Sequence, residues 1–483
     1  MADSKTAQAT QYINTHKITQ GIQEALIDLL NKCPEDPYGE LSQIFKMKAA
    51  PPVVDHLVGR EVLDSRGNPT VEVDVYVKYL GKVFLAARSS APSGASTGSN
   101  EARELRDSES TRFGGKGTLK AANNVTTLLT SALKGCSLSD LRSLDGAICD
   151  VDGTELKEKI GGNACTATSF ALSEAASVVL EEPLFIYLAR QYFKELPKKF
   201  KLPSPFFNII NGGKHAGGKL KIQEFMVSPR KDVPFPDQLR MVSEVYHKLG
   251  ALLVQEYGPS AKNLGDEGGF APLLNTPEEA ITIIEKAIQA AGYKPAEDIH
   301  IALDAAASEF YIHETKKYEV EVGVFKSGDE MIQYWKDLVS RHPAIISIED
   351  GLDEQDHEHW IKLNNELGEK IHLVGDDLYT TNPSTIRKGL EGKWANSLLL
   401  KVNQIGTISE AMDAARLILE SNQWVMVSHR SGETCNSVIA DLAVAIGAQA
   451  IKTGSTARGE RIQKYTRLVQ IYEYLKENNM LDE

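Results

Sequence analysis

Leu398-Leu399-Leu400-Lys401 is a short apolar run that ends at a charged residue, and runs of the same form recur through the second half of the chain. They end at polar positions, which are Asp304, Glu349, Asp376, Lys401, His429 and Lys452. Continuous apolar strands are typical of parallel sheets that helices cover on both faces. The ends are 45, 27, 25, 28 and 23 residues apart, and a strand with its return helix needs about 30 residues. The pattern predicts an α/β fold, with a β/α barrel over residues 198–483.

Residues 55–197 show a different order, in which strands come first and helices follow. Residues 70–77 alternate between apolar and polar side chains, as a strand with one buried face does. Gly81 marks a turn into a second strand at 83–87, and helical patterns occupy most of residues 101–194. Strands followed by helices predict an α+β domain that precedes the barrel.

Residues 1–54 form a helical extension and linker in this interpretation. Apolar residues recur at helical spacing from Ile18 to Leu30, and prolines 34 and 37 end that helix. A second short apolar set predicts another helix at 38–45, and residues 46–54 are expected to be a linker. A helix pair of about 38 residues is too small to bury a core alone. It therefore packs on a second copy, on another protein, or on its own domain, and the sequence leaves these alternatives open.

Composition excludes several functional classes. The chain has 483 residues, 42% of them hydrophobic, with a net charge of -13. This charge predicts no general binding to nucleic acid or to anionic membranes. Five cysteines without C-x-x-C spacing indicate neither a disulfide framework nor a zinc site. No apolar run approaches the roughly 18 residues of a membrane span, and no signal peptide is evident, so we expect a cytoplasmic protein.

The strand ends carry the chemistry. The carboxyl ends of barrel strands meet at one mouth, so Asp304, Glu349 and Asp376 are expected to lie close together. Three such carboxylates repel one another without a cation, and Mg²⁺ prefers oxygen ligands. Any one of them alone would more simply be a solvated or salt-bridged acid. Their recurrence at corresponding positions favours a magnesium site.

Lysines and further acids are expected at the same mouth. Lys401 or Lys452, near a metal and other cations, has its charged form disfavoured, so that its pKa falls and it becomes a usable base. Each lysine taken alone would be a salt-bridge partner. Glycine-rich loops at 211–218 and 265–269 carry His215 and Glu267. Together these groups suit removal of a proton next to a carboxylate while a metal stabilises the enolate charge.

Several motifs match one family. They are 64–73 (DSRGNPTVEV), 93–98 (SGASTG), 265–269 (GDEGG), 399–407 (LLKVNQIGT) and 427–434 (VSHRSGET). From about residue 58 to about residue 475 the chain resembles the enolases, which dehydrate 2-phosphoglycerate. The resemblance implies an enolase-type (β/α)8 barrel behind an α+β capping domain, a homodimer, and two Mg²⁺ ions per active site. A lysine or histidine base that works with Mg²⁺ is a known property of this superfamily.

The resemblance also implies a role for each site residue. Asp304, Glu349 and Asp376 match the ligands of one Mg²⁺, and Ser96 matches a loop serine that joins the second. Lys401 matches the base that takes the C2 proton. Glu267 matches the acid that protonates the departing hydroxyl, with Glu224 assisting. The residues that match substrate and phosphate contacts are His215, His429, Arg430, Ser431 and Lys452.

Two alternatives remain beside catalysis by an enolase. One is a scaffold protein with an enolase body, because residues 12–45, including Pro34-Glu35-Asp36-Pro37-Tyr38, resemble the docking helices of the Dpy-30 and regulatory-subunit type. Such an extension implies a protein partner and a tether to a cytoskeletal or ciliary structure. The other alternative is a different acid-sugar dehydratase of the superfamily. It is disfavoured by the 93–98 loop and by the Arg430-Ser431 pair.

Overall fold

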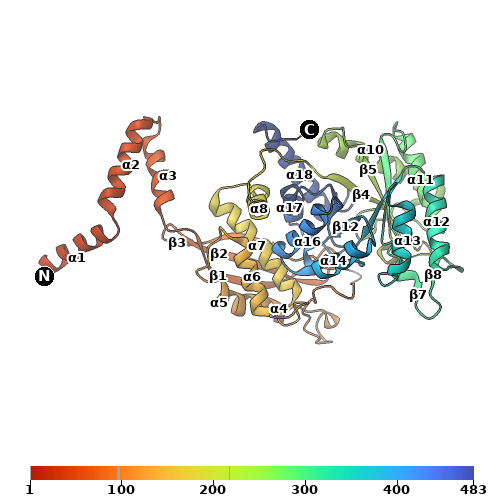
Figure 1. The fold of residues 1–483 in the computed structure, drawn as a ribbon, viewed down its shortest axis with the longest axis horizontal. Helices are drawn as coiled ribbons and strands as arrows, with labels where there is room; N and C mark the ends of the chain where they lie inside the picture. Colours follow the sequence, from red (N-terminus) through yellow and green to blue (C-terminus); the bar gives the residue numbers. More distant parts are fainter. Residues whose placement is uncertain (1, 95–97, 217, 483) are drawn as a thin grey trace.

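The structure, a computed structural model, describes residues 2–94, 98–216 and 218–482. Figure 1 shows a body that contains all the strands, and three N-terminal helices that lie to one side of it. Ser96, predicted to be a metal ligand, lies outside the described residues.

The strands of the described residues form three sheets. Their bounds are β1 Val53–Leu63, β2 Pro69–Tyr79, β3 Lys82–Ser90, β4 Ser204–Asn211, β5 Glu224–Pro229, β6 Ile299–Asp304, β7 Tyr311–Ile312, β8 Lys317–Glu321, β9 Val324–Lys326, β10 Ile345–Glu349, β11 His372–Gly375, β12 Ser397–Leu400, β13 Trp424–Ser428 and β14 Ala450–Lys452.

The α-helices begin with the extension and continue through both parts of the body. Their bounds are α1 Ala2–Thr15, α2 Ile18–Lys32, α3 Pro37–Lys48, α4 Leu119–Asn124, α5 Thr130–Leu133, α6 Leu141–Asp152, α7 Gly162–Leu180, α8 Leu184–Tyr192, α9 Gly213–Ala216, α10 Phe235–Tyr257, α11 Pro277–Ala290, α12 Gly328–Arg341, α13 His357–Leu367, α14 Pro383–Gly392, α15 Val402–Ile405, α16 Ile408–Glu420, α17 Val438–Ile446 and α18 Gly459–Glu477. Within the described residues, no helix has the length and hydropathy of a membrane span.

The barrel closes in the strand order β10-β11-β12-β13-β14-β4-β5-β6. The predicted apolar runs are β6 and β10 to β14, so the predicted α/β barrel is confirmed. One strand departs from the parallel pattern, because β5 pairs antiparallel with both β4 and β6. The long interval between Asp304 and Glu349 is explained by the small antiparallel sheet β7-β8-β9, which is inserted between β6 and α12.

Successive side chains along a barrel strand belong to different hydrophobic clusters. Leu398 and Leu400 belong to the main hydrophobic core, whereas Leu399 belongs to a separate small cluster. The other buried members of that cluster come from neighbouring barrel strands and are Phe206, Met226, Ala302, Val374, Met426 and Ala450. We assign this cluster to the barrel interior, which is therefore a packed core and not a channel.

An antiparallel sheet β1-β2-β3 precedes the barrel, and α7 packs on β2 and β3. Val71, Val73, Val75 and Val77 of β2 are fully buried, as the alternation at 70–77 predicts. Strand β1 was not predicted, because most of its side chains are only half-buried and its sequence shows no clear alternation. The expected linker is correspondingly shorter, since α3 runs to Lys48 and β1 begins at Val53.

The extension consists of α1, which was not predicted, and of the helices α2 and α3, which match the two expected helices. Helix α3 begins where the Asp36 side chain accepts a hydrogen bond of 2.9 Å from the backbone N–H of Gly39. Ala25 and Ile44 are buried, but most of the large apolar side chains of α2 and α3 are exposed. An ion pair between Lys46 and Glu181 joins α3 to the body.

Candidate active site

The barrel topology brings the predicted strand-end residues to one mouth. Asp304, Glu349 and Lys452 are the last residues of β6, β10 and β14, and Asp376 and Lys401 directly follow β11 and β12. A polar cavity at this mouth is lined by residues from both parts of the body, which include Glu101, His215, Glu224, Glu267, Asp304, Asp376, Asp377, Lys401, His429, Arg430, Ser431 and Lys452. Every described member of the predicted site except Glu349 lines the cavity, and Glu349 contacts the cavity residue Lys452.

The Lys452 ammonium lies among three carboxylates. Its Nζ is 3.1 Å from Asp304 Oδ2, 2.8 Å from Glu349 Oε2 and 2.8 Å from Glu224 Oε2. Burial lowers the pKa of Lys452, but these carboxylates raise it by more, so that it lies well above its ordinary value. Lys452 is therefore a permanent cation here and does not have the lowered pKa that a base needs.

Lys401 pairs with Asp376 on the neighbouring side of the mouth. Gln404 Nε2 donates to the other oxygen of the same carboxylate at 2.8 Å. Burial lowers the pKa of Lys401, and Asp376 raises it by more, so the net shift is upward. The expected lowering of the Lys401 pKa was stated for a site that holds a metal ion and stays a prediction, because the group nearest to Lys401 here is the Asp376 carboxylate.

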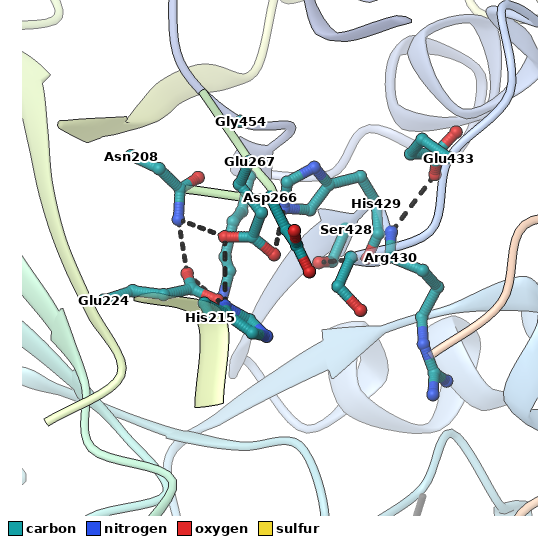
Figure 2. A network of polar contacts seen from close by, with 12 residues as sticks. Asn208, His215, Glu224, Asp266, Glu267, Ser428, His429, Arg430, Glu433 and Gly454 are labelled. Atoms are coloured by element: carbon teal, nitrogen blue, oxygen red, sulfur yellow. Dashed lines mark hydrogen bonds and ion pairs between the residues drawn. The ribbon is translucent and has the colours of Figure 1, made fainter. Parts of the chain in front are cut away.

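Glu224 and Glu267 form a carboxylate pair on β5 and on the 265–269 loop (Figure 2). Asn208 donates from Nδ2 to both carboxylates, at 2.9 Å for Glu267. His215 Nδ1 lies 3.5 Å from Glu224 and 3.6 Å from Glu267. Burial and the adjacent Glu267 charge raise the pKa of Glu224 to about 8. Burial also raises the pKa of Glu267, but His215 and Lys452 beside it lower that pKa by more. The two pKa values are thus shifted in opposite directions, and Glu224 is the member of the pair whose protonated form is favoured.

The tautomer of His429 follows from its hydrogen-bond partner. Arg461 Nη1 lies 2.7 Å from His429 Nδ1, and a guanidinium can only donate. Burial lowers the pKa of His429 well below its ordinary value, so the ring is neutral and carries its proton on Nε2. This N–H faces Glu267 Oε1 at 3.4 Å (Figure 2).

Arg430 and Ser431 lie at the edge of the cavity, and the next residue, Gly432, pairs with Ser93. Arg430 Nη1 donates to Glu101 Oε2 at 2.9 Å, and Arg66 Nη1 donates to Ser431 Oγ at 3.2 Å. Ser93 exchanges backbone hydrogen bonds of 2.7 and 2.9 Å with Gly432. Guanidinium groups and a hydroxyl gathered in this way suit an anionic ligand such as a phosphate.

The charges at the mouth fit a divalent cation. Six carboxylates and three permanent cations line the cavity. The six carboxylates offer oxygens of the kind that Mg²⁺ prefers. Among the described residues, two groups bring ligand atoms within 4.8 Å of one another, namely His215-Glu224-Glu267 and Asp350-Asp376-Asp377. The predicted set Asp304, Glu349 and Asp376 does not meet this distance, because Lys452 lies between the first two and Lys401 pairs with the third.

Sequence reasoning missed three residues that hold the site together. Asn208 connects the carboxylate pair, Glu101 accepts from Arg430, and Arg461 sets the His429 tautomer while it donates to the backbone oxygens of Arg430 and Ser431. Asn208 carried a detectable signal, as a polar residue inside the apolar run of β4. Glu101 and Arg461 carried none, since their partners are distant in the sequence.

Comparison with known proteins matches both parts of the body. The protein-family model for the enolase N-terminal domain matches residues 54–188. The protein-family model for the enolase C-terminal TIM barrel domain matches residues 199–482. The protein named enolase from Pyrococcus furiosus is 48% identical over 420 residues, which cover 87% of this chain and 94% of that relative. The enolase of Methanopyrus kandleri is 47% identical over 424 residues, covering 88% and 96% of the two chains. The chain therefore belongs to the enolase family.

Proposed function

We propose that this protein catalyses the reversible, Mg²⁺-dependent dehydration of 2-phosphoglycerate to phosphoenolpyruvate, as a hydro-lyase. The observation that carries the proposal is the convergence, at one barrel mouth, of Lys401 and Lys452 with the hydrogen-bonded carboxylate pair Glu224 and Glu267. Elimination of water next to a carboxylate needs both, because one group must take a proton and another must give one to the leaving hydroxyl.

Lys401 is the proposed base. Its ammonium is paired with Asp376, so it must lose a proton before it can take one from C2. The same Asp376 carboxylate is a proposed metal ligand. Lys401 would come closer to the neutral form that a base needs if Asp376 held a cation, because the interaction that raises the pKa of Lys401 would then be weaker.

Glu267 and Glu224 form the proposed acid side. Glu267 is assigned as the acid that meets the departing hydroxyl, and Glu224 is the group whose protonated form is favoured. Asn208 donates to both carboxylates, which keeps them close enough to share one proton. Neutral His429 presents its Nε2–H toward Glu267 and helps to hold it in place.

Asp304, Glu349 and Asp376 are the residues that we propose hold one Mg²⁺, and Ser96 is proposed for a second. A bound Mg²⁺ supplies positive charge that stabilises the enolate as it develops on the substrate carboxylate. Lys452 is proposed to pair with that carboxylate. His215, His429, Arg430 and Ser431 are proposed for substrate and phosphate contacts.

Phosphoenolpyruvate formation by the purified full chain tests this function. We expect turnover with Mg²⁺, loss of turnover when a chelator removes divalent cations, and recovery when Mg²⁺ is restored. Absence of turnover in excess Mg²⁺ would contradict the proposal. Substitution of Asp304 by Asn serves as the matched variant, because it keeps the side-chain size and removes one proposed ligand charge.

A second proposed function is docking of a protein partner through residues 12–45. Its support is the exposure of large apolar side chains on α2 and α3, with Leu30 at 72% and Tyr38 at 83%. Apolar helix faces of this kind are typical of protein interaction sites. We include a homodimer, cytoplasmic localisation with a cytoskeletal or ciliary tether, and the division into residues 1–54, 55–197 and 198–483 as parts of the proposal.

Capture of a partner by the full chain tests the docking function. The variant Leu26→Asp places a charge on the exposed face of α2, where Leu26 is 46% exposed. We expect this change to abolish capture and to leave enolase turnover unchanged. The control Glu35→Gln changes a charge in the α2–α3 connection and should capture the partner normally. Equal capture by the Leu26→Asp variant would contradict the assignment.

A further inference from the structure

Asp350 connects three strand ends at the mouth of the barrel. Its backbone N–H donates to Val374 O of β11 at 3.0 Å, and its backbone oxygen accepts from Ala307 N, beyond β6, at 2.9 Å. Its carboxylate accepts from two successive backbone N–H groups, those of Asp376 at 2.9 Å and of Asp377 at 2.8 Å. Asp350 itself directly follows Glu349 of β10. One buried residue, through its backbone and its side chain together, therefore links the segments that carry Asp304, Glu349 and Asp376.

The sheet alone does not fix the position of Asp376. Glu349 is in register with Asp304 of β6 and with Val374 of β11. Strand β11 ends at Gly375, so Asp376 follows the last residue of the strand. The two hydrogen bonds to the Asp350 carboxylate replace the missing ladder bonds and set the direction in which the backbone leaves the strand.

The conformation of Asp350 restricts which residues can do this. Its φ is 42°, in the left-handed region that Asp and Asn tolerate better than other residues with side chains. Both carboxylate oxygens accept a backbone N–H, whereas an amide side chain has one oxygen acceptor and an NH₂ group that only donates. Gly351 packs behind it, where its oxygen accepts from Trp335 Nε1 at 2.9 Å. The loop is thus held from both sides, and the carboxylate is the part that faces the 376–377 backbone.

We infer that Asp350 is a positioning residue: it fixes the backbone at Asp376, from which the Asp376 carboxylate would join Asp304 and Glu349 on a shared divalent cation. This inference rests on the proposed function, which assigns those three residues as Mg²⁺ ligands. Asp350 does not line the cavity and acts through Asp376. Residues that orient metal ligands in this way typically change metal affinity by roughly 10- to 100-fold when they are replaced.

The variant Asp350→Asn tests the inference, since Asn keeps the size and tolerates the same backbone conformation. Calorimetry with Mg²⁺ alone, in the absence of substrate, is expected to show affinity weaker by roughly 10- to 100-fold. Turnover should shift to higher Mg²⁺ concentrations and recover in part at saturation, with the KM for 2-phosphoglycerate at saturating Mg²⁺ little changed. Unchanged Mg²⁺ affinity would overturn the inference.

Asp152→Asn is the matched control. Asp152 is also buried, and its carboxylate accepts backbone N–H groups of Thr154, Lys159 and Ile160. The control should lower the thermal unfolding midpoint and keep wild-type Mg²⁺ affinity. Loss of Mg²⁺ affinity in this control as well would show a general effect of destabilisation and would overturn the specific role of Asp350.

Hydrogen exchange of the wild-type protein provides a readout that does not depend on the variant folding. The amides of Asp376 and Asp377 should exchange as slowly as those of the neighbouring strands, and fast exchange would contradict the inference. The outcomes also separate the two proposals. If the wild-type protein binds no Mg²⁺ and forms no phosphoenolpyruvate, the proposed function fails. If the wild-type protein is active and the Asp350→Asn variant binds Mg²⁺ with the same affinity, only the positioning role is refuted.

Discussion

The barrel mouth buries charged side chains and pairs them with one another, whereas the N-terminal extension leaves large apolar side chains exposed. Lys452 is 2% exposed and has carboxylate partners from three barrel strands. Tyr38 on α3 is 83% exposed. A buried charge is tolerated only with partners, and an exposed apolar side chain gains stability only when something covers it. The charged groups of the mouth therefore have their partners within the chain, whereas the large apolar side chains of α2 and α3 are mostly left exposed.

This contrast has a consequence for substitutions. A change at the mouth removes a charged group with its own proposed role in the reaction, so it is expected to alter catalysis strongly. Changes in the extension remove exposed surface, and they are expected to alter association while the body works as before. The predictions below test this separation, from the largest expected effect to the smallest.

Replacement of Lys401 by Met should have the largest effect. It removes the proposed base and leaves Asp376 without its ammonium partner. General base catalysis contributes roughly 10² to 10⁴ in rate, and we expect kcat to fall toward the upper end of that range. Steady-state turnover at saturating Mg²⁺ measures the loss. Lys388→Met, at an exposed lysine of α14, is the control and should be fully active. Wild-type kcat in the Lys401 variant would exclude this residue as the base.

Replacement of Glu267 by Gln should have the next largest effect. Gln keeps the length of the side chain and cannot exchange a proton with Glu224. We expect kcat to fall by roughly 10²- to 10³-fold. The KM for 2-phosphoglycerate should change much less, because the proposed role is proton transfer. A variant whose KM rises while kcat stays constant would assign Glu267 to substrate binding instead.

Asp145→Asn tests the cost of a buried charge away from the mouth. Asp145 of α6 accepts from Ser409 N at 2.9 Å, and burial raises its pKa to about 6. Because the folded pKa lies above the unfolded value, Asp145 favours the folded state most at low pH, and its contribution falls as pH rises from about 4 to 6. The difference amounts to about 3 kcal/mol once the carboxylate is ionised.

The free energy of unfolding, measured for both proteins from pH 4 to pH 7, checks this prediction. The free energy of unfolding of the Asn variant, relative to that of wild type, should increase from about pH 4 to pH 6 and then stay level. A relative stability that does not depend on pH would show that Asp145 is not the group whose ionisation matters.

Deletion of residues 2–48 should have the smallest effect on catalysis. No sheet of the described residues includes a strand from the extension, and an ion pair of Lys46 with Glu181 joins α3 to the body. We expect kcat within about twofold of wild type, since exposed ion pairs contribute about 1 kcal/mol or less. Lys46→Ala, which removes that ion pair alone, is the control. A large loss of turnover on deletion would break the separation between the two regions.

The sequence predicted the mouth better than it predicted the details that hold the mouth together. The apolar runs before Asp304, Glu349 and Asp376 are local patterns, and the closed barrel brings their ends together. The antiparallel direction of β5 was not readable, because a buried strand has the same composition in either direction.

The missed residues share one physical reason. Glu101 meets Arg430 across 329 positions of sequence, and no local pattern encodes that contact. Strand β1 was missed because its side chains are mostly half-buried on both faces, so that it lacks the alternation that identified β2. The upward shift of the Lys401 pKa depends on Asp376, whose distance from Lys401 only the folded structure defines.

Exchange of the C2 hydrogen of 2-phosphoglycerate with heavy water tests most directly whether Lys401 is the base and Glu267 the acid. The wild-type protein with Mg²⁺ should exchange this hydrogen. Glu267→Gln should retain the exchange although it forms little phosphoenolpyruvate, and Lys401→Met should lose both. Two results would contradict the account. One is exchange at the wild-type rate in Lys401→Met, and the other is loss of exchange in Glu267→Gln while Lys401→Met retains it.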